Sequence, residues 1–171
     1  PVPKKATKKL PEIKIDPPDC SGLTYKGAIT HGGEIYPGIY DTIQVNASEV
    51  LIMHKGLYCL DGNFKAVGGG VITGNNVTIY MRSGEIDLLG AANVILTAPN
   101  CITSICGVPP AIRGILFYMA PTNLSTIKFA GNSTSDFMGT ILAMNNDVTI
   151  RGTSDQSTME TQIIGKSVTI T

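Results

Sequence analysis

The chain of 171 residues predicts an all-β fold, a parallel β-helix or β-solenoid that follows an extended arm rich in proline and lysine. The first observation is a recurring phrase, a turn residue followed by β-branched residues: Asn76-Val77-Thr78-Ile79, Asn93-Val94-Ile95-Leu96, Asp147-Val148-Thr149-Ile150 and Ser167-Val168-Thr169-Ile170. The second is its spacing, 20 residues from Val148 to Val168 and 23 from Ile127 to Ile150, which is typical of one solenoid turn. The third is that no segment of a dozen residues repeats its apolar positions at helical spacing.

Residues 1–19 predict an extended arm or linker, and residues 20–171 predict the β-helix domain. The arm holds five prolines and five lysines, and proline disfavours both helices and central strands. One interpretation is a disordered terminus. The other is a strand through Ile13 and Ile15, in the alternating phrase Glu12 to Asp16, that pairs with a sheet edge of this molecule or of a neighbour.

From Cys20 onward, glycines and prolines divide the chain into short segments of strand character. We expect strands at 43–46, 50–53, 57–60, 71–73, 77–81, 86–89, 94–97, 115–119, 126–129, 140–143, 148–151, 161–164 and 168–171. An immunoglobulin-like sandwich is the main alternative. It is disfavoured because the chain has no tryptophan and no tyrosine-corner pattern to anchor two packed sheets.

In a solenoid, alternate residues of each strand point inward. The inward set is expected to be apolar: Val77, Ile79, Ile86, Leu88, Ile127, Phe129, Val148, Ile150, Val168 and Ile170. The outward set is expected to be polar: Thr78, Asp87, Lys128, Thr149, Arg151 and Thr169. The phrases 74–76 and 145–147 are expected to turn corners, because Asn and Gly adopt the left-handed backbone conformation most easily.

Composition excludes several function classes. Positive and negative side chains balance at 13 each, so no global field attracts nucleic acid or an anionic membrane. The longest apolar run, 115–120, is far shorter than the roughly 20 residues of a membrane-spanning helix, and the lysines of the arm are not followed by the apolar stretch of a signal peptide. Charged residues are only 15% of the chain, a balance that favours an extracellular or cell-surface location.

Four cysteines, Cys20, Cys59, Cys101 and Cys106, allow three disulfide pairings, and the sequence alone does not choose among them. The close spacing of Cys101 and Cys106 suggests a small loop staple, which leaves Cys20 to join the start of the domain to Cys59. A zinc site is the alternative, but there is no CxxC spacing and neither histidine lies in a ligand motif. Disulfides are therefore the favoured interpretation.

The residue types that carry chemistry predict no catalytic, metal or cofactor site, and hence no enzyme. Polysaccharide cleavage would need clustered acids, and only Glu85 and Asp87 lie two apart, with Asp61 the nearest further candidate on an adjacent turn. His31 and His54 lack evident partners, and the glycine run 68–70 is not followed by the residues of a phosphate loop. The sequons at Asn46, Asn76, Asn123 and Asn132 are interpreted as corner residues that match the motif by chance.

Several phrases resemble a known bacterial family. They are Tyr36-Pro37-Gly38-Ile39-Tyr40, Gly56-Leu57-Tyr58, Val77-Thr78-Ile79-Tyr80, Leu96-Thr97-Ala98-Pro99, Gly114-Ile115-Leu116-Phe117-Tyr118, Phe137-Met138-Gly139-Thr140-Ile141, Gln162-Ile163-Ile164 and Ser167-Val168-Thr169-Ile170. The chain from about residue 27 to 171 thus resembles the secreted β-helical region of TadG-like surface proteins, which are associated with tight-adherence (Flp) pilus systems. The resemblance implies a right-handed parallel β-helix at the bacterial cell surface, with no catalytic residue to transfer.

The expected function is a structural protein that self-associates, by head-to-tail stacking or by strand addition, into a filament or surface layer. Residues expected at such contacts are Ile13, Ile15, Leu116, Phe117, Tyr118, Met119, Val168 and Ile170. In the stretch 115–120 every residue is apolar or aromatic, so one alternate set must face outward. That set is covered either by a loop or the arm of the same molecule or by a neighbour. An adhesin-like module that binds a glycan through exposed tyrosines, such as Tyr25, Tyr40 or Tyr80, is the alternative function.

Overall fold

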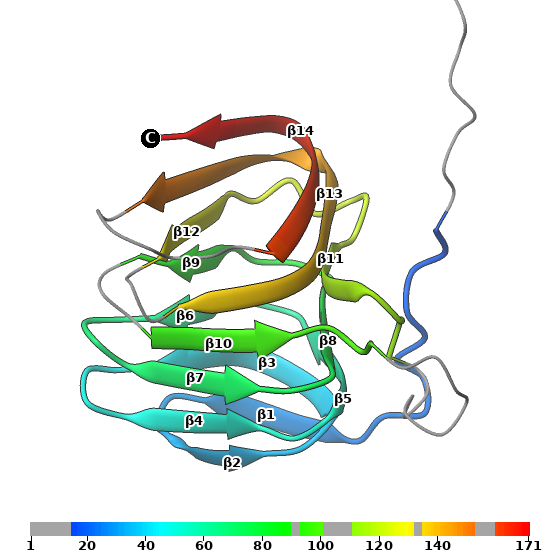
Figure 1. The fold of residues 1–171 in the computed structure, drawn as a ribbon. Coiled ribbons are helices and arrows are strands. Elements are labelled where there is room, and N and C mark those ends of the chain that lie inside the picture. Colours follow the sequence, from blue (N-terminus) through cyan, green and yellow to red (C-terminus); the bar gives the residue numbers. More distant parts are fainter. Residues whose placement is uncertain (1–14, 90–92, 101–110, 132–134, 153–159) are drawn as a thin grey trace, which may run out of the picture.

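The computed structural model describes residues 15–89, 93–100, 111–131, 135–152 and 160–171, and within them it contains strands and no helix. The 14 strands form one continuous sheet, and every pair of neighbouring strands is parallel (Figure 1). Pairing with the strand one turn later, rather than with the next strand in sequence, is the arrangement of a solenoid. The predicted fold class, an all-β parallel β-solenoid, is confirmed. The described residues include no helix long and apolar enough to cross a membrane.

The strands stack in three columns, which we call faces A, B and C. Face A consists of β2 (Gly33–Ile35), β4 (Val50–Met53), β7 (Val71–Gly74), β10 (Asn93–Thr97) and the first residues of β13 (Asp136–Gly152). Face B consists of the start of β3 (Gly38–Val45), β5 (Gly56–Leu60), β8 (Val77–Met81), β11 (Ile115–Met119) and the middle of β13. Face C consists of the end of β3, β6 (Phe64–Ala66), β9 (Ile86–Leu88), β12 (Ile127–Gly131) and the end of β13.

The two ends of the stack are formed by different strands. At one end, β1 (Tyr25–Ile29) pairs with β3, and β2 pairs only with β4. At the other end, β14 (Glu160–Ile170) follows β13 through nearly its whole length and has no second partner strand among the described residues. Each end therefore carries a strand with one backbone edge that is unpaired in the sheet.

The register corrects one predicted spacing. Val148 pairs with Val168, as the 20-residue repeat predicts. Ile127, however, pairs with Val148, while Ile150 pairs with Phe129, so the 23-residue repeat from Ile127 to Ile150 is wrong. A strand contributes two inward positions, and the sequence pattern alone cannot show which of the two matches its counterpart one turn earlier.

A continuous apolar column fills the interior. Eight of the ten predicted inward residues are buried, from Val77 to Ile150, and only Val168 and Ile170 are exposed, because no described strand lies beyond β14. The column contains a ladder of aromatic rings, Phe64, Phe117, Phe129 and Phe137, with centroids 5.4 to 5.9 Å apart. Each fully buried phenylalanine stabilises the fold by roughly 1.5 to 3 kcal/mol.

Thirteen strands were expected, and each of those segments overlaps an observed strand, four of them extending one residue beyond it, but three observed strands were missed and two pairs are fused. The missed strands are short, three to five residues each; β1 and β2 lie at the end of the stack, and β6 lies inside face C between β3 and β9. The segments 140–143 and 148–151 join in β13, and 161–164 and 168–171 join in β14. The chain bends from face B to face C there, and pairing with β14 resumes at Asp147 after a register shift that begins at Ala143. Residues 145–147 are part of a strand and not the predicted left-handed corner.

Corners elsewhere do use the expected backbone conformations. Asn76 has a φ of 59°, as predicted for the corner that leads from face A to face B. At the corner between faces B and C, Gly84 has a φ of 80°, and a Cβ there would lie 2.3 Å from the backbone carbonyl of Gly62 one turn below. Only glycine fits such a position, because the next turn leaves no room for a side chain.

Thr78 is a second correction. It was expected to face solvent, yet it is fully buried on the outer side of face B. Its hydroxyl accepts a hydrogen bond from the Ile112 amide at 3.1 Å and donates to the Ile115 carbonyl at 2.9 Å. The outer side of face B is therefore covered at Thr78, and the Thr78 hydroxyl joins the residues at Ile112 and Ile115 to this face.

Candidate interaction surfaces

Residues 15–23, which we call the strap, cross the outer side of face B (Figure 1). The carbonyl of Ile15 accepts a hydrogen bond of 2.8 Å from the Tyr118 hydroxyl on β11. Five residues later, Cys20 is joined by a disulfide to Cys59 on β5. The strap thus runs across the strands from β11 to β5. Ile15 belongs to no strand, so the described chain shows no strand pairing there, while Ile13 lies outside the described residues.

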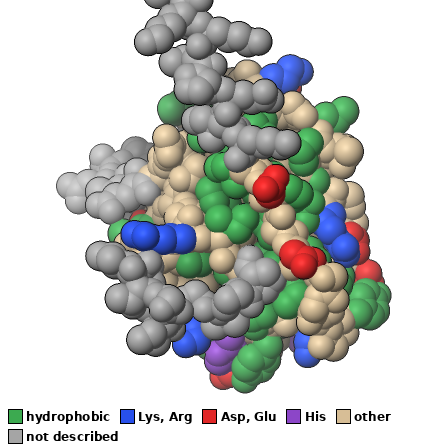
Figure 2. Space-filling view, turned by 90° about the vertical axis from the view of Figure 1, so that its right-hand side faces the viewer, with side chains coloured by type: hydrophobic (Ala, Val, Ile, Leu, Met, Phe, Trp, Pro, Cys, Tyr) green, Lys and Arg blue, Asp and Glu red, His purple; other side chains and the backbone are tan. Residues whose placement is uncertain are grey.

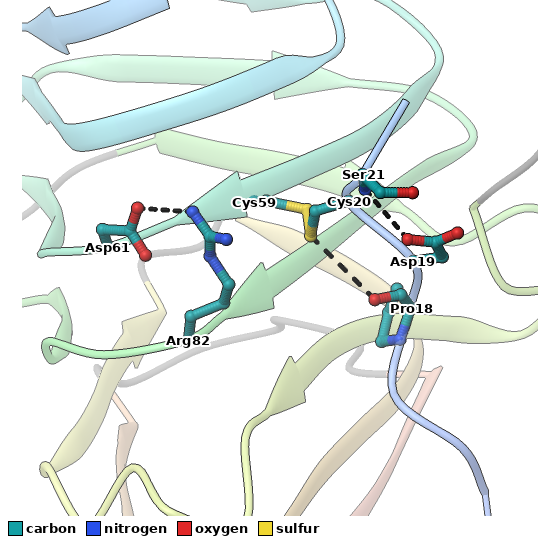
Figure 3. The surroundings of a disulfide bond; sticks show 7 residues. All are labelled: Pro18, Asp19, Cys20, Ser21, Cys59, Asp61 and Arg82. Atoms are coloured by element: carbon teal, nitrogen blue, oxygen red, sulfur yellow. Dashed lines mark hydrogen bonds and ion pairs between the residues drawn. A yellow bond between two sulfur atoms is a disulfide. The ribbon is translucent and has the colours of Figure 1, made fainter. Parts of the chain in front are cut away.

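The disulfide is buried within an apolar cluster outside the central core. Cys20 and Cys59 are 8% and 0% exposed, and they pack with Leu57 and with partly buried residues that include Leu23 and Tyr80. Figure 3 shows the disulfide beside Pro18, Asp19 and Ser21 of the strap. The predicted pairing of Cys20 with Cys59 is confirmed. Cys101 and Cys106 lie outside the described residues. Beside the disulfide, the Ser21 amide donates to Asp19 at 2.9 Å, and this hydrogen bond lowers the pKa of the Asp19 carboxyl.

The apolar stretch of β11 is buried on both sides. Leu116, Phe117 and Met119 belong to the central core, whereas Tyr118 packs outside it with Ile115 and Leu142, against Ile15 of the strap. Figure 2 shows this side of the molecule, where apolar side chains gather near the middle and charged ones are scattered. Of the two interpretations of the outward set, coverage by the same molecule is the one observed. The four side chains from Leu116 to Met119 therefore offer no open surface in the single chain.

The end at β14 is open in the described chain. Val168 stacks on Val148 and Ile170 on Ile150, so both continue buried columns, yet they are 43% and 75% exposed. Their exposure follows from position alone, because the same type of residue one turn earlier is 1% to 8% exposed. This end combines an unpaired strand edge with apolar side chains that lack a covering layer.

The outer side of face A is a further surface, which the sequence analysis missed. Its exposed large side chains are Val50, Ile52, Ile95 and Met138, each 37% to 49% exposed. They come from three strands, β4, β10 and β13, so no contiguous segment of the sequence shows them together. The alternation of each strand could have indicated an apolar outward position, but not which strands share a face.

Two of the three acidic residues that could have formed a polysaccharide-cleaving site, Glu85 and Asp61, form ion pairs with basic residues of a neighbouring turn. Glu85 lies 2.6 Å from the Lys65 ammonium, and this contact, followed by a hydrogen bond from Thr126, lowers the pKa of the Glu85 carboxyl. Asp61 pairs with Arg82. Asp87 neighbours Lys65 in the register of face C. No group of three or more His, Cys, Asp or Glu side chains that could hold a metal occurs within the described part of the chain.

His54 lies in a cluster at the corner between faces A and B. Its ring stacks on Tyr36 with centroids 4.2 Å apart, and its Nε2 atom lies 3.0 Å from the Glu34 carboxylate. A cavity of about 350 Å³ adjoins it, lined by Ile52, Met53, His54, Lys55, Thr73, Gly74, Asn75 and Asn76. A second cavity, of about 340 Å³, also includes Asn76 and continues past Thr97 and Asn100. The sequence contains a faint signal for the cluster, because Glu34 and His54 are one turn, 20 residues, apart.

The tyrosines named for a glycan-binding face do not share one. Tyr25 is 62% exposed, but Tyr40 is buried in the core and Tyr80 packs edge-on against Tyr118 beneath the strap. Tyr40 was misplaced because its strand, β3, turns its alternate residues into the core. The expected exposure is therefore confirmed for Tyr25, is wrong for Tyr40, and is wrong in part for Tyr80, which is partly buried.

The sequons behave largely as structural residues. Asn123 is 4% exposed, and its side-chain amide donates to the carbonyls of Met81 and Gly84, so its nitrogen is not available to a glycan in this fold. The Asn46 amide donates to the Thr30 carbonyl at 2.8 Å. Asn76 occupies the left-handed corner, and Asn132 lies outside the described residues.

No protein-family model, curated protein or solved structure matches the chain. The resemblance to TadG-like proteins therefore stays a prediction.

Proposed function

We propose that this protein is a non-enzymatic structural subunit that self-associates head to tail through the ends of its solenoid. The observation that carries the proposal is the open end at β14, where Val168 and Ile170 continue the core without a covering layer. Covering Ile170, which is 75% exposed, would contribute roughly 1 to 2 kcal/mol, and each backbone hydrogen bond of a new strand pair would add to it.

The opposite end supports the same contact. There, within the described chain, β1 pairs only with β3 and lies over faces B and C, the same two faces that β14 covers at the other end, and all strands of the stack run in parallel. A second copy placed in the same orientation would therefore meet β14 with strands that run in the matching direction. Such a contact joins two different surfaces, and a contact of this type propagates into a filament unless it closes into a ring.

We place the protein outside the cytoplasm, at the bacterial cell surface. The buried disulfide between Cys20 and Cys59 supports this location, because disulfides persist mainly in oxidising compartments. The TadG-like resemblance supports a role beside a tight-adherence pilus, as a subunit of a surface layer or filament.

Light scattering coupled to size-exclusion chromatography, over a hundredfold range of concentration, tests the proposal together with negative-stain microscopy. Wild type is expected to grow in mass with concentration and to form elongated particles. Ile170→Lys should remain monomeric, because it places a charge in the contact. Its matched control is Ile95→Lys, which adds the same charge to an apolar residue of face A that is 39% exposed.

Two outcomes refute the proposal. One is a wild-type protein that stays monomeric throughout the concentration range with its β-sheet circular dichroism intact. The other is assembly that Ile170→Lys leaves unchanged but Ile95→Lys abolishes, which would assign the contact to face A.

A further inference from the structure

The corner between faces A and B carries an ordered aromatic pair at the surface. Tyr36 is 54% exposed, and His54 stacks on it almost in parallel, with an interplanar angle of 6°. Glu34 approaches the imidazole edge at 3.0 Å. Exposed rings are usually free to move, so a stacked and hydrogen-bonded pair at the surface calls for an explanation of what holds it.

Two buried tyrosines hold this pair from below. The Tyr58 hydroxyl contacts the backbone carbonyls of Ile35 and His54, at 2.9 and 2.6 Å, and so joins the two loops that carry the rings. The Tyr40 hydroxyl donates to the carbonyl of Tyr36 at 2.5 Å. Burial raises the pKa of both phenols, so both remain protonated donors. The aromatic pair is therefore positioned before any ligand arrives, which reduces the entropy lost on binding.

The cavity beside His54 provides the polar half of a site. His54 both stacks on Tyr36 and lines the cavity, whose other polar side chains are Lys55, Thr73, Asn75 and Asn76. The second cavity is also lined by Asn76, so the two cavities adjoin the same corner residue, and together we call them the groove. Asn75 and Thr97 are hydrogen-bonded to each other at 3.3 Å across one turn. Amides and hydroxyls can both donate and accept, and the groove contains one ammonium group, that of Lys55.

We propose that this groove binds a neutral oligosaccharide. A sugar presents an apolar C–H face, which packs on aromatic rings, and hydroxyl groups, which need partners that both donate and accept. The corner supplies both, because His54, which lines the first cavity, is stacked on Tyr36, and Asn75 and Asn76 line the same cavity. A phosphorylated or strongly anionic ligand fits less well, because Lys55 supplies the one ammonium group among the lining residues and the Glu34 carboxylate lies 3.0 Å from the His54 ring.

The test is a titration of the full chain, labelled with ¹⁵N, with three neutral trisaccharides: maltotriose, cellotriose and the β-1,4-linked trimer of N-acetylglucosamine. At least one should shift the amide signals of residues 54–55 and 75–76, with a Kd of about 1 mM or tighter. Tyr36→Ala and Asn75→Ala should each weaken that binding about tenfold or more. Tyr25→Ala is the matched control, because it removes a tyrosine of similar exposure from β1 and should leave binding unchanged.

The proposal is overturned if none of the three sugars shifts these signals at about 20 mM, or if both groove variants bind as wild type does. It is also overturned if Tyr25→Ala weakens binding as much as Tyr36→Ala. The site lies at a corner and not at the end formed by β14, so this outcome is independent of self-association. Tyr36 and Asn75 are both exposed, so if one of the two substitutions alters the fold, the other still tests the proposal.

Discussion

Removing the disulfide between Cys20 and Cys59, with the double variant Cys20→Ala and Cys59→Ala, should destabilise the protein by about 4 kcal/mol. The two cysteines are 39 residues apart, and restricting a loop of that length lowers the entropy of the unfolded chain by an amount equivalent to about 4 kcal/mol at 25 °C. Loss of the buried sulfur atoms from the outer cluster adds to this value.

The loss should be local as well as global. The cross-linked loop contains β1 to β5, and the strap continues from it to Tyr118 on β11. Stacked turns contact mainly their neighbours, so one end of a solenoid can open while the other stays folded. We therefore expect the amides of β1 to β5 to lose protection against hydrogen exchange first, and those of β12 and β13 to lose it least.

Urea unfolding followed by circular dichroism measures the total effect, and hydrogen exchange with mass spectrometry locates it. Reduced wild type is the control, since it loses the cross-link without any substitution and should lose nearly the same stability. A loss below about 1 kcal/mol, or an equal loss of protection in every strand, would show that the strap does not anchor the first turns.

Three further results are expected. Gly84→Ala should destabilise the fold by about 3 kcal/mol in urea unfolding, because its φ is 80° and the new Cβ would meet the Gly62 carbonyl; a loss under about 1 kcal/mol would contradict the corner geometry. Phe117→Ala should cost roughly 3 to 5 kcal/mol, since the ring is fully buried between two others, and an unchanged urea midpoint would disprove the aromatic ladder. Burial raises the pKa of Tyr58, so the folded chain keeps a proton that the unfolded chain loses near pH 10. Stability should be constant below about pH 10 and fall above it, as absorbance at 295 nm and circular dichroism would report; unfolding that begins below pH 9 would contradict this assignment.

The fold class followed from local pattern, because a solenoid repeats the same requirement at every turn. Alternation of apolar and polar residues defines strands, and a repeat of about 20 residues indicates stacking. The same logic failed where the pattern was locally ambiguous. Ile127 has two inward successors in β13, and only the packing of Phe129 on Ile150 identifies its partner as Val148.

The candidate surfaces were less predictable, because they depend on what covers each face. The all-apolar stretch of β11 left two coverings open, and the strap, tied to Tyr118 by its hydrogen bond, is the one found. The pairing of Cys20 with Cys59 was favoured among three possible disulfide pairings, because the close spacing of Cys101 and Cys106 suggested that those two cysteines pair with each other. The corner with Tyr36 and His54 was missed, since a stack between turns has no contiguous signature in the sequence.

The sequence by itself determined that this chain forms short parallel strands around an aliphatic and aromatic core, because side-chain alternation is a property of each strand alone. Only the tertiary structure decided which outward residues are covered, which turns stand in register, and which polar groups from different turns meet in one groove. Those contacts join residues 20 or more positions apart, and their geometry is set by how the corners turn and by where the strap lies.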